Sequence, residues 1–129
     1  MLLSIDKMKS DPLYLQIRNQ LVSAIAKGQL EPGEVLPSVR SLASDLGVNL
    51  HTVNKAYALL QDEGYVMMAG RNGTIVVERT APKTTQEQRE LDNAIKETLR
   101  QVFMDYCAKG GTVASFVALV NRIVEEGEE

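Results

Sequence analysis

The polar residues best suited to chemistry lie close together in the middle of the chain, just after a glycine. They are two short amides, an imidazole, a hydroxyl and one long cation: Asn49, His51, Thr52, Asn54 and Lys55. Such groups can hydrogen-bond base edges and phosphate oxygens. The same residue types also cap the solvated start of many ordinary helices. The elements around them must decide between nucleic-acid contact and a plain helix start.

Two short helices joined by a tight turn are predicted over 38–46 and 49–63. Ser38 and Asn49 suit the N-caps because their side chains can accept from unpaired backbone N–H groups. Gly47 suits the end of the first helix because glycine takes a left-handed conformation without steric cost. The apolar positions recur at helical spacing and predict the buried faces. They are Leu42, Ala43, Leu46, Val53, Ala56, Tyr57 and Leu60.

This pair is typical of a helix-turn-helix, in which the start of the second helix points away from the core and enters a major groove. A β-hairpin is predicted directly afterwards, with strands over 65–68 and 74–78 and a tight turn at Asn72-Gly73. A hairpin in this place is the wing of a winged helix. Its tip offers Arg71, Asn72 and Gly73 to DNA, although a hairpin that only covers the core would look similar.

The N-terminal part supplies a further core element. Residues 1–10 read as an arm or a short strand. A helix is expected from Asp11 as the cap and Pro12 in the first turn, where its missing N–H does no harm. Its apolar stripe runs to Ile25, and Gly28 ends it.

The last third predicts a helical hairpin. We expect a winged helix-turn-helix over 1–79, a linker over 80–85 and two helices over 86–129, opened by a Thr85/Gln88 capping box and broken at Gly110-Gly111. The hairpin has more apolar surface than two helices can hide, so either a second subunit or the winged helix must cover it. We favour a homodimer formed through Leu91, Ile95, Leu99, Val102, Phe103, Tyr106, Phe116, Val120 and Ile123.

Composition limits the function classes. The net charge is −3, and residues 1–79 carry equal numbers of acidic and basic side chains, so attraction to DNA would be local. One His, one Cys, no metal-ligand spacing and no phosphate-binding glycine loop predict no enzyme, no metal and no cofactor. The single Cys107 suits a reducing compartment. No apolar run is long enough for a membrane helix, and no signal peptide is evident, so a cytoplasmic protein is expected.

With these residues identified, the stretch from Pro12 to Val77 resembles the DNA-binding domain of the GntR family of bacterial transcription regulators. The fold class expected is therefore mainly α with a small β-hairpin. The short helical tail resembles the YtrA-type subfamily, which implies a dimeric repressor of an inverted-repeat operator, in that group often the operator of a transporter operon. The matching segments are Pro12-Leu13-Tyr14, Gly28–Gly33, Leu36–Arg40, Leu46–Asn49, Thr52-Val53, Ala56-Tyr57 and Glu63-Gly64.

The resemblance also implies roles for single residues. Arg40, beside Ser38, would reach DNA from the first helix of the pair, the alternative being a salt bridge to Asp45. Lys55 would meet a phosphate, while Asn49 and Thr52 open the recognition helix. His51 and Asn54 lie at positions that vary in the family and are candidates for sequence preference, or His51 is an idle surface residue.

The wing and any effector site each have more than one interpretation from the sequence. The wing departs from the family's Gly-x-Gly pattern, so its contact with the minor groove is less well supported than the helix contacts. A small-molecule effector would have to bind at the dimer interface or between the hairpin and the winged helix. A protein–protein adaptor is the competing function, because the chain is acidic.

Overall fold

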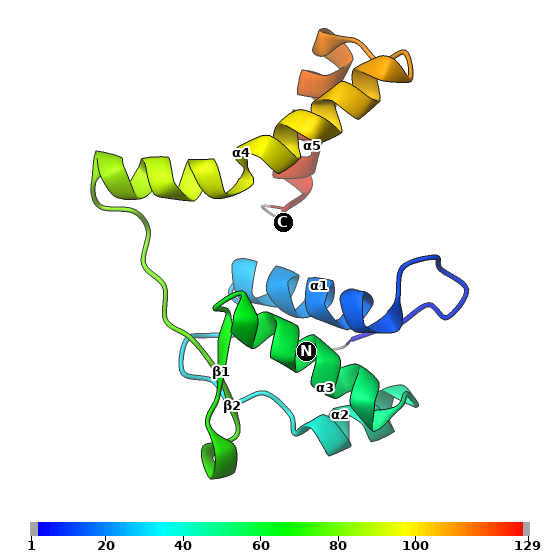
Figure 1. Ribbon diagram of the computed structural model, residues 1–129, viewed down its shortest axis with the longest axis vertical. Coiled ribbons are helices and arrows are strands. Elements are labelled where there is room, and N and C mark those ends of the chain that lie inside the picture. Colours follow the sequence, from blue (N-terminus) through cyan, green and yellow to red (C-terminus); the bar gives the residue numbers. More distant parts are fainter. Residues whose placement is uncertain (1–2, 128–129) are drawn as a thin grey trace. The chain divides into compact units, whose positions relative to one another are not determined.

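The computed structural model describes residues 3–127, and its contacts divide the chain after Arg79 into two units (Figure 1). The expected fold class is confirmed: a winged helix-turn-helix is followed by two helices. The described elements of the first unit are α1 (Leu13–Ala26), α2 (Val39–Leu46), α3 (Leu50–Asp62), β1 (Val66–Met68), the 3-10 turn η1 (Gly70–Asn72) and β2 (Thr74–Val76). Those of the second are α4 (Thr85–Ala108) and α5 (Val113–Gly127).

Helix α1 begins one residue later than the sequence predicted. Pro12 takes the N-cap position with an extended ψ of 147°, and the Asp11 side chain does not cap. Instead the Pro12 carbonyl accepts from the N–H groups of Leu15 and Gln16, at 3.1 and 3.2 Å. The Asp11 carboxylate lies 3.8 Å from the ammonium of Lys9. Pro12 therefore begins the helix through its backbone carbonyl, without a side-chain cap.

The N-terminal residues form an arm and not a strand. No strand occurs between residues 3 and 10. Two glutamine amides one turn apart on α1 hold the arm by its backbone. Gln16 accepts from the N–H of Asp6 at 2.8 Å and donates to the Asp6 carbonyl at 3.0 Å. Gln20 makes the same pair of bonds with Ser4. Gln16 is only 7% exposed, so its polar group is buried with full hydrogen bonding.

Helices α2 and α3 have the caps that the sequence predicted. Ser38 Oγ accepts from the N–H of Ser41 at 3.0 Å, and Asn49 Oδ1 accepts from the N–H of His51 at 2.8 Å. Gly47 lies between the helices with φ 68°, which is the left-handed conformation expected of it. These caps fix where the second helix begins and therefore which polar side chains it presents.

The small sheet contains more than the predicted hairpin. Strands β1 and β2 pair antiparallel, with Val66 opposite Val76. The segment 33–36 lies along the other edge of β2, because the N–H of Leu36 donates to the Thr74 carbonyl at 2.8 Å and Val35 forms a bridge with Ile75. The sequence predicted no strand there. Its hydrogen bonds are made with residues about forty positions away, which local periodicity does not report.

The wing turn differs from the expected two-residue Asn-Gly turn. Residues 70–72 form a 3-10 turn, and the N–H of Ala69 donates to the Gly73 carbonyl at 2.8 Å. Gly70 and Gly73 both have positive φ, at 58° and 82°. Because both glycines can adopt this conformation, the strands are joined by five residues. The single Asn-Gly pair would have favoured a two-residue turn.

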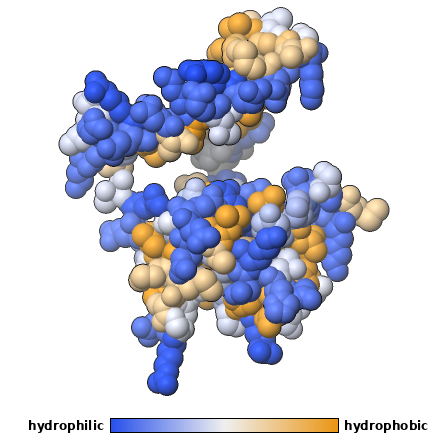
Figure 2. All heavy atoms as spheres, in the orientation of Figure 1, coloured by the Kyte–Doolittle hydropathy of each residue, from blue (hydrophilic) through white to orange (hydrophobic). Residues whose placement is uncertain are grey.

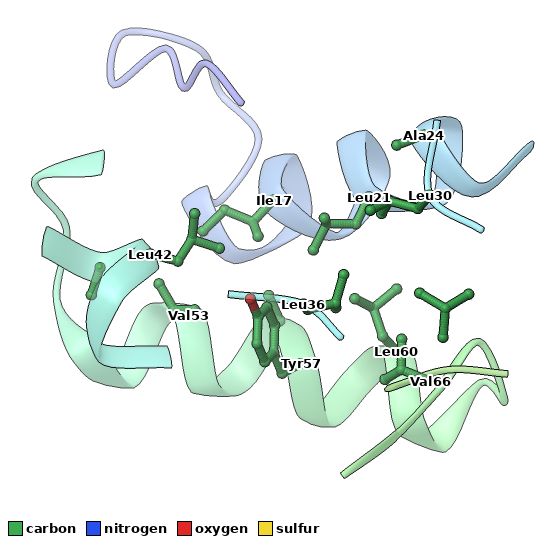
Figure 3. Packing of buried hydrophobic residues seen from close by; sticks show 13 residues of the cluster. Ile17, Leu21, Ala24, Leu30, Leu36, Leu42, Val53, Tyr57, Leu60 and Val66 are labelled. Atoms are coloured by element: carbon green, nitrogen blue, oxygen red, sulfur yellow. The ribbon is translucent and has the colours of Figure 1, made fainter. Parts of the chain in front are cut away.

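The core of the first unit lies between α1, α3 and the hairpin (Figure 3). Tyr57 is fully buried at its centre and donates its hydroxyl to the Pro37 carbonyl at 2.7 Å, so its polar atom is satisfied. All the α3 positions expected on the buried face are buried. The buried hydrophobic residues are Ile17, Leu21, Ala24, Leu30, Leu36, Leu42, Ala43, Val53, Ala56, Tyr57, Leu60, Val66 and Val76.

The second unit is a helical hairpin that opens one residue earlier than predicted. Thr84, not Thr85, is the N-cap of α4, and its hydroxyl accepts from the N–H of Glu87 at 3.1 Å. The Glu87 carboxylate accepts from the N–H of Lys83 at 2.7 Å, so Glu87 takes the role predicted for Gln88 but binds the N–H of the residue before the N-cap. A carboxylate near the positive end of a helix dipole is a better partner than an amide.

Aromatic residues pack α4 against α5 near their connection. The centroid of the Phe116 ring lies 4.9 Å from that of the Phe103 ring and 5.4 Å from that of the Tyr106 ring. Both pairs pack edge to face. The Tyr106 hydroxyl donates to Ser115 Oγ at 2.8 Å. A side chain at Gly111 would collide with the Tyr106 ring, which explains the second glycine of the pair. Figure 2 shows hydrophobic residues gathered on the surface near this connection.

No residue of α4 or α5 is buried within the described part of this unit. Between residues 3 and 127, no helix has both the length and the apolar character that crossing a membrane requires.

Candidate nucleic-acid interface

The first part of the candidate interface is a shallow depression between α2 and the start of α3. It is lined by Arg40 from α2 and by His51 and Asn54 from α3, over an apolar floor of Val39 and Leu50. All three polar side chains are exposed. His51 and Asn54 are three apart on a helix and so share a face. The fold therefore brings together one cation and two groups able to read base edges.

Arg40 is free to reach a ligand. It is the second residue of α2 and lies on the surface. Within residues 3–127 no ion pair joins it to Asp45, the alternative partner that the sequence suggested. An exposed guanidinium with five donors is suited to phosphate oxygens or to the major-groove edge of guanine.

The two cap residues have only part of their hydrogen-bonding capacity in use. Ser38 Oγ and Asn49 Oδ1 each accept a backbone N–H. The hydroxyl hydrogen of Ser38 and the amide NH₂ of Asn49 remain donors. Both can therefore serve the helix start and still donate to a phosphate. The sequence offered capping and DNA contact as alternatives, and the geometry allows both.

Thr52 and Lys55 lie apart from this depression, on the side of α3 that faces α1. The ammonium of Lys55 lies 4.1 Å from the centroid of the Tyr14 ring, a cation–π contact. Thr52 is half-buried. The sequence gave Tyr14 no role beyond its place in the motif. Its ring holds the long Lys55 side chain in one direction, which lowers the entropy that a phosphate contact would cost.

The wing supplies the second part. A groove of about 480 Å³ separates it from the start of α2, and its lining includes Ser38, Arg71, Asn72 and Gly73. Arg71 and Asn72 are exposed at the tip. Gly73 allows close approach to the neighbouring segment, because a Cβ there would lie 3.0 Å from Cγ1 of Val35. The wing tip and the N-cap of α2 thus line one groove.

A further cation that the sequence did not single out lies at the turn between α2 and α3. Lys7, on the N-terminal arm, donates from its ammonium to the Gly47 carbonyl at 3.4 Å. The only sequence signal for this contact is that the segment before the first helix carries basic residues. Its placement depends on the bonds from Gln16 and Gln20, which sequence periodicity does not reveal.

Two pKa shifts belong to the scaffold and not to the interface. Burial raises the pKa of the Tyr57 phenol to about 12, because the charged form would be desolvated. The hydrogen bonds that Arg18 donates to the Glu63 carboxylate raise the pKa of the Arg18 guanidinium above its ordinary value. The Arg18 and Glu63 side chains meet through two bonds of 2.9 Å. This bidentate pair ties α1 to the end of α3.

Three helices followed by a hairpin, with polar residues at the start of the third helix and a basic tip on the hairpin, define a winged helix-turn-helix DNA-binding protein. The model for "Bacterial regulatory proteins, gntR family" matches residues 13–76. The chain is 38% identical over 104 residues to the HTH-type transcriptional repressor YtrA of Bacillus subtilis, covering 81% of this chain and 78% of that protein. The chain belongs to the GntR family of transcription regulators, and it is not an enzyme.

Solved structures agree with this assignment. YtrA from Sulfolobus acidocaldarius, a GntR-family transcription factor, matches with a TM-score of 0.65 and 36% identity, over 84% of this chain and 99% of that one. The DNA-binding domain of AraR in complex with operator ORE1 matches with a TM-score of 0.51 and 26% identity, over 60% and 94%. The expected resemblance to the YtrA type is confirmed.

Proposed function

We propose that this chain is a dimeric repressor that binds an inverted-repeat operator. One observation carries the proposal: the DNA-facing polar residues and an uncovered apolar helix face occur in the same chain. Family membership supports operator binding. Repression is proposed because the similar YtrA of Bacillus subtilis is a transcriptional repressor. We extend the proposal to an operon that encodes a transporter, which rests on the YtrA-type resemblance alone.

We assign base contacts and phosphate contacts to different residues from the geometry of the interface. His51 and Asn54 would read base edges, because they face outward from the start of α3 beside Arg40. Ser38, Arg40, Asn49, Thr52 and Lys55 would position the helix on phosphates. Arg71, Asn72 and Gly73 would place the wing against the minor groove. Contacts to phosphates fix the register, and the few base contacts give the sequence preference.

The proposed dimer interface is the outer apolar stripe of the helical hairpin. On α4 the side chains of Leu91, Ile95 and Leu99 are each at least half exposed. Their spacing of four residues places them in one row. A second copy presents the same row, so a two-fold pairing would cover both. The exposed hydrophobic residues of the hairpin are Leu91, Ile95, Leu99, Val102, Met104, Val113, Val117, Val120, Ile123 and Val124.

Three residues predicted at the dimer interface have a partner within their own hairpin. Phe103, Tyr106 and Phe116 pack on one another, so their first role is to join α4 to α5. A small-molecule effector that binds at the dimer interface would stabilise the dimer. A screen of candidate ligands by thermal melting detects such a molecule as a rise in melting temperature, and no rise in the screen contradicts this part of the proposal for the ligands tested.

The test is selection of the purified protein on a random duplex library, followed by titration of the selected sequence at several salt concentrations. The proposal expects a short inverted repeat. It also expects log affinity to fall linearly with log salt, since phosphate contacts release counterions. Recovery of single, unpaired half-sites would contradict the dimeric reading. The absence of any salt-dependent binding would favour the protein–protein adaptor instead, which the acidic net charge of −3 makes the second candidate.

A further inference from the structure

One arginine at the end of the first unit connects the wing to the recognition helix. The last backbone hydrogen bond of the hairpin is donated by Val77 to the Tyr65 carbonyl, at 3.0 Å. Beyond it, the Arg79 guanidinium donates to the Gly64 carbonyl at 2.8 Å and to the Glu63 carbonyl at 3.4 Å. Within the described residues, these are the last hydrogen bonds before the N–H of Lys83.

The carbonyls that Arg79 binds lie just past the C-terminus of α3. A helix end carries partial negative charge, and a cation placed there is stabilised by it. Gly64 provides the room: a Cβ at this residue would lie only 2.5 Å from the Arg79 guanidinium, and its φ of +86° already favours glycine. Arg79 therefore fastens the exit of β2 to the end of the helix that faces DNA.

Neighbouring side chains hold the guanidinium in place. Its central carbon lies 5.6 Å from the centroid of the Tyr65 ring, and that of Arg18 lies 5.6 Å from the same ring. Arg18 is in turn bonded to Glu63 by two 2.9 Å hydrogen bonds. Three elements thus meet at this point: α1 through Arg18, the end of α3 through Glu63, and the start of the linker through Arg79.

We propose that Arg79 determines which half-site spacings the protein accepts, by fixing where the linker leaves the winged helix. The inference rests on the proposed dimer and inverted-repeat operator. With Arg79 bound, only residues 80–84 connect the fixed point to α4. When it is released, residues 78 and 79 join the free segment.

The expected size of the effect follows from chain dimensions. Two more free residues lengthen the reach of each linker by roughly 7 Å, since an extended residue spans up to about 3.5 Å. One base pair rises by about 3.4 Å. Each winged helix could then reach sites displaced by about two base pairs. Arg79 is exposed and does not touch the polar cluster of α2 and α3, so its loss should not change how one winged helix reads one half-site.

The experiment measures affinity for a series of duplexes that carry the selected half-sites. Their spacing ranges from four base pairs shorter to four base pairs longer than in the selected operator. Wild-type protein and Arg79→Ala are compared at one salt concentration, together with a duplex containing a single half-site. Arg79→Lys is included because it keeps the charge but not the forked donor geometry. Lys83→Ala is the matched control, since it removes one positive charge from the same linker.

We expect the wild type and Lys83→Ala to discriminate sharply against a change of two base pairs. In Arg79→Ala the preference should fall to within about threefold, because effective concentration then varies little over that range. Affinity for the single half-site should stay within about twofold of wild type. The spacing preference of Arg79→Lys should lie between that of the wild type and that of Arg79→Ala. Melting temperature and dimer mass, measured on the same samples, should match those of the wild type.

Two results would overturn the inference in different ways. If the wild type prefers one spacing and Arg79→Ala keeps the same preference, Arg79 has no role in spacing while the proposed function stands. If the wild type binds without any spacing preference, the dimeric inverted-repeat function fails and the inference fails with it.

Discussion

Arg40 is the residue on which the proposed docking on DNA depends most directly. Its guanidinium is exposed beside His51 and Asn54, and within residues 3–127 it forms no ion pair. The scaffold therefore needs it little, whereas DNA binding should need it strongly.

Arg40→Ala should weaken binding to the selected operator by about 1–3 kcal/mol, the usual value of one good arginine contact to DNA. Titration by fluorescence anisotropy measures this loss. Lys27→Ala is the matched control, because it removes an exposed cation at the C-cap of α1, outside the proposed interface. Unchanged affinity in Arg40→Ala, or an equal loss in Lys27→Ala, would show that Arg40 does not contact the operator.

Tyr57 gives a second prediction at the residue scale, this time for stability. Tyr57→Phe removes the hydrogen bond to Pro37 and should lower the free energy of unfolding by about 1 kcal/mol near neutral pH. The folded pKa of about 12 lies above the ordinary value of 10.0. The folded state thus holds the proton more tightly, so this contribution is complete below pH 10 and is lost as pH rises through 12.

Urea unfolding of the wild type and Tyr57→Phe between pH 8 and pH 11.5 tests the direction of this pH dependence. The wild-type advantage should shrink toward the upper end of this range, because only the wild type must keep a buried phenol protonated. Comparing the two proteins at each pH cancels the other lysines and tyrosines that titrate there. A difference that stays constant with pH would contradict the assignment.

At the scale of elements, the N-terminal arm is placed by side chains on α1. Gln16 binds the backbone of Asp6 on both sides and donates to the Asp11 carbonyl, and the arm carries Lys7 to the turn between α2 and α3. The place of Lys7 beside the proposed DNA-contacting residues therefore depends on the bonds from Gln16, together with those from Gln20 to Ser4.

Gln16→Ala should loosen the arm around Asp6, while Gln20 still holds Ser4. The amide of Asp6 should then exchange its hydrogen much faster, because its acceptor is gone, and the unit should lose about 1–3 kcal/mol of stability. Hydrogen exchange and urea unfolding measure the two effects. Gln29→Ala, an exposed position after α1, is the control and should change neither. Undiminished protection of Asp6 in Gln16→Ala would show that another group holds the arm.

At the scale of the whole molecule, the exposed apolar row on α4 would connect assembly to operator binding in the proposed dimer. Ile95 is 59% exposed in the single chain, the largest value in the row. A dimer through this row would bury it, whereas a monomer would leave it in water.

Ile95→Glu should convert the protein to monomers, because a buried, unpaired carboxylate costs several kcal/mol. Light scattering should report 14.2 kDa in place of twice that mass. Affinity for the full inverted repeat should fall to that for a single half-site. Asn93→Glu adds the same charge on the opposite side of α4 and should remain dimeric. A dimer in Ile95→Glu would move the interface away from this row.

The sequence by itself determined the order of elements, the family and most helix ends. Ser38, Gly47 and Asn49 act within a few residues of themselves, so their capping roles could be predicted from local chemistry alone. The apolar spacing of α3 likewise predicted its buried face, because periodicity is a local property that tertiary packing then uses. The motif that indicated the GntR family is built from these same local features.

Tertiary structure decided what depends on residues far apart in the chain. The strand-like pairing of 33–36 with β2, the hold of Gln16 on the arm and the place of Lys55 over Tyr14 all join distant segments. The attachment of Arg79 to the end of α3 is of the same kind. Such contacts form only after the chain has folded, because their geometry is set by the packing of whole elements and leaves no periodic trace in the sequence.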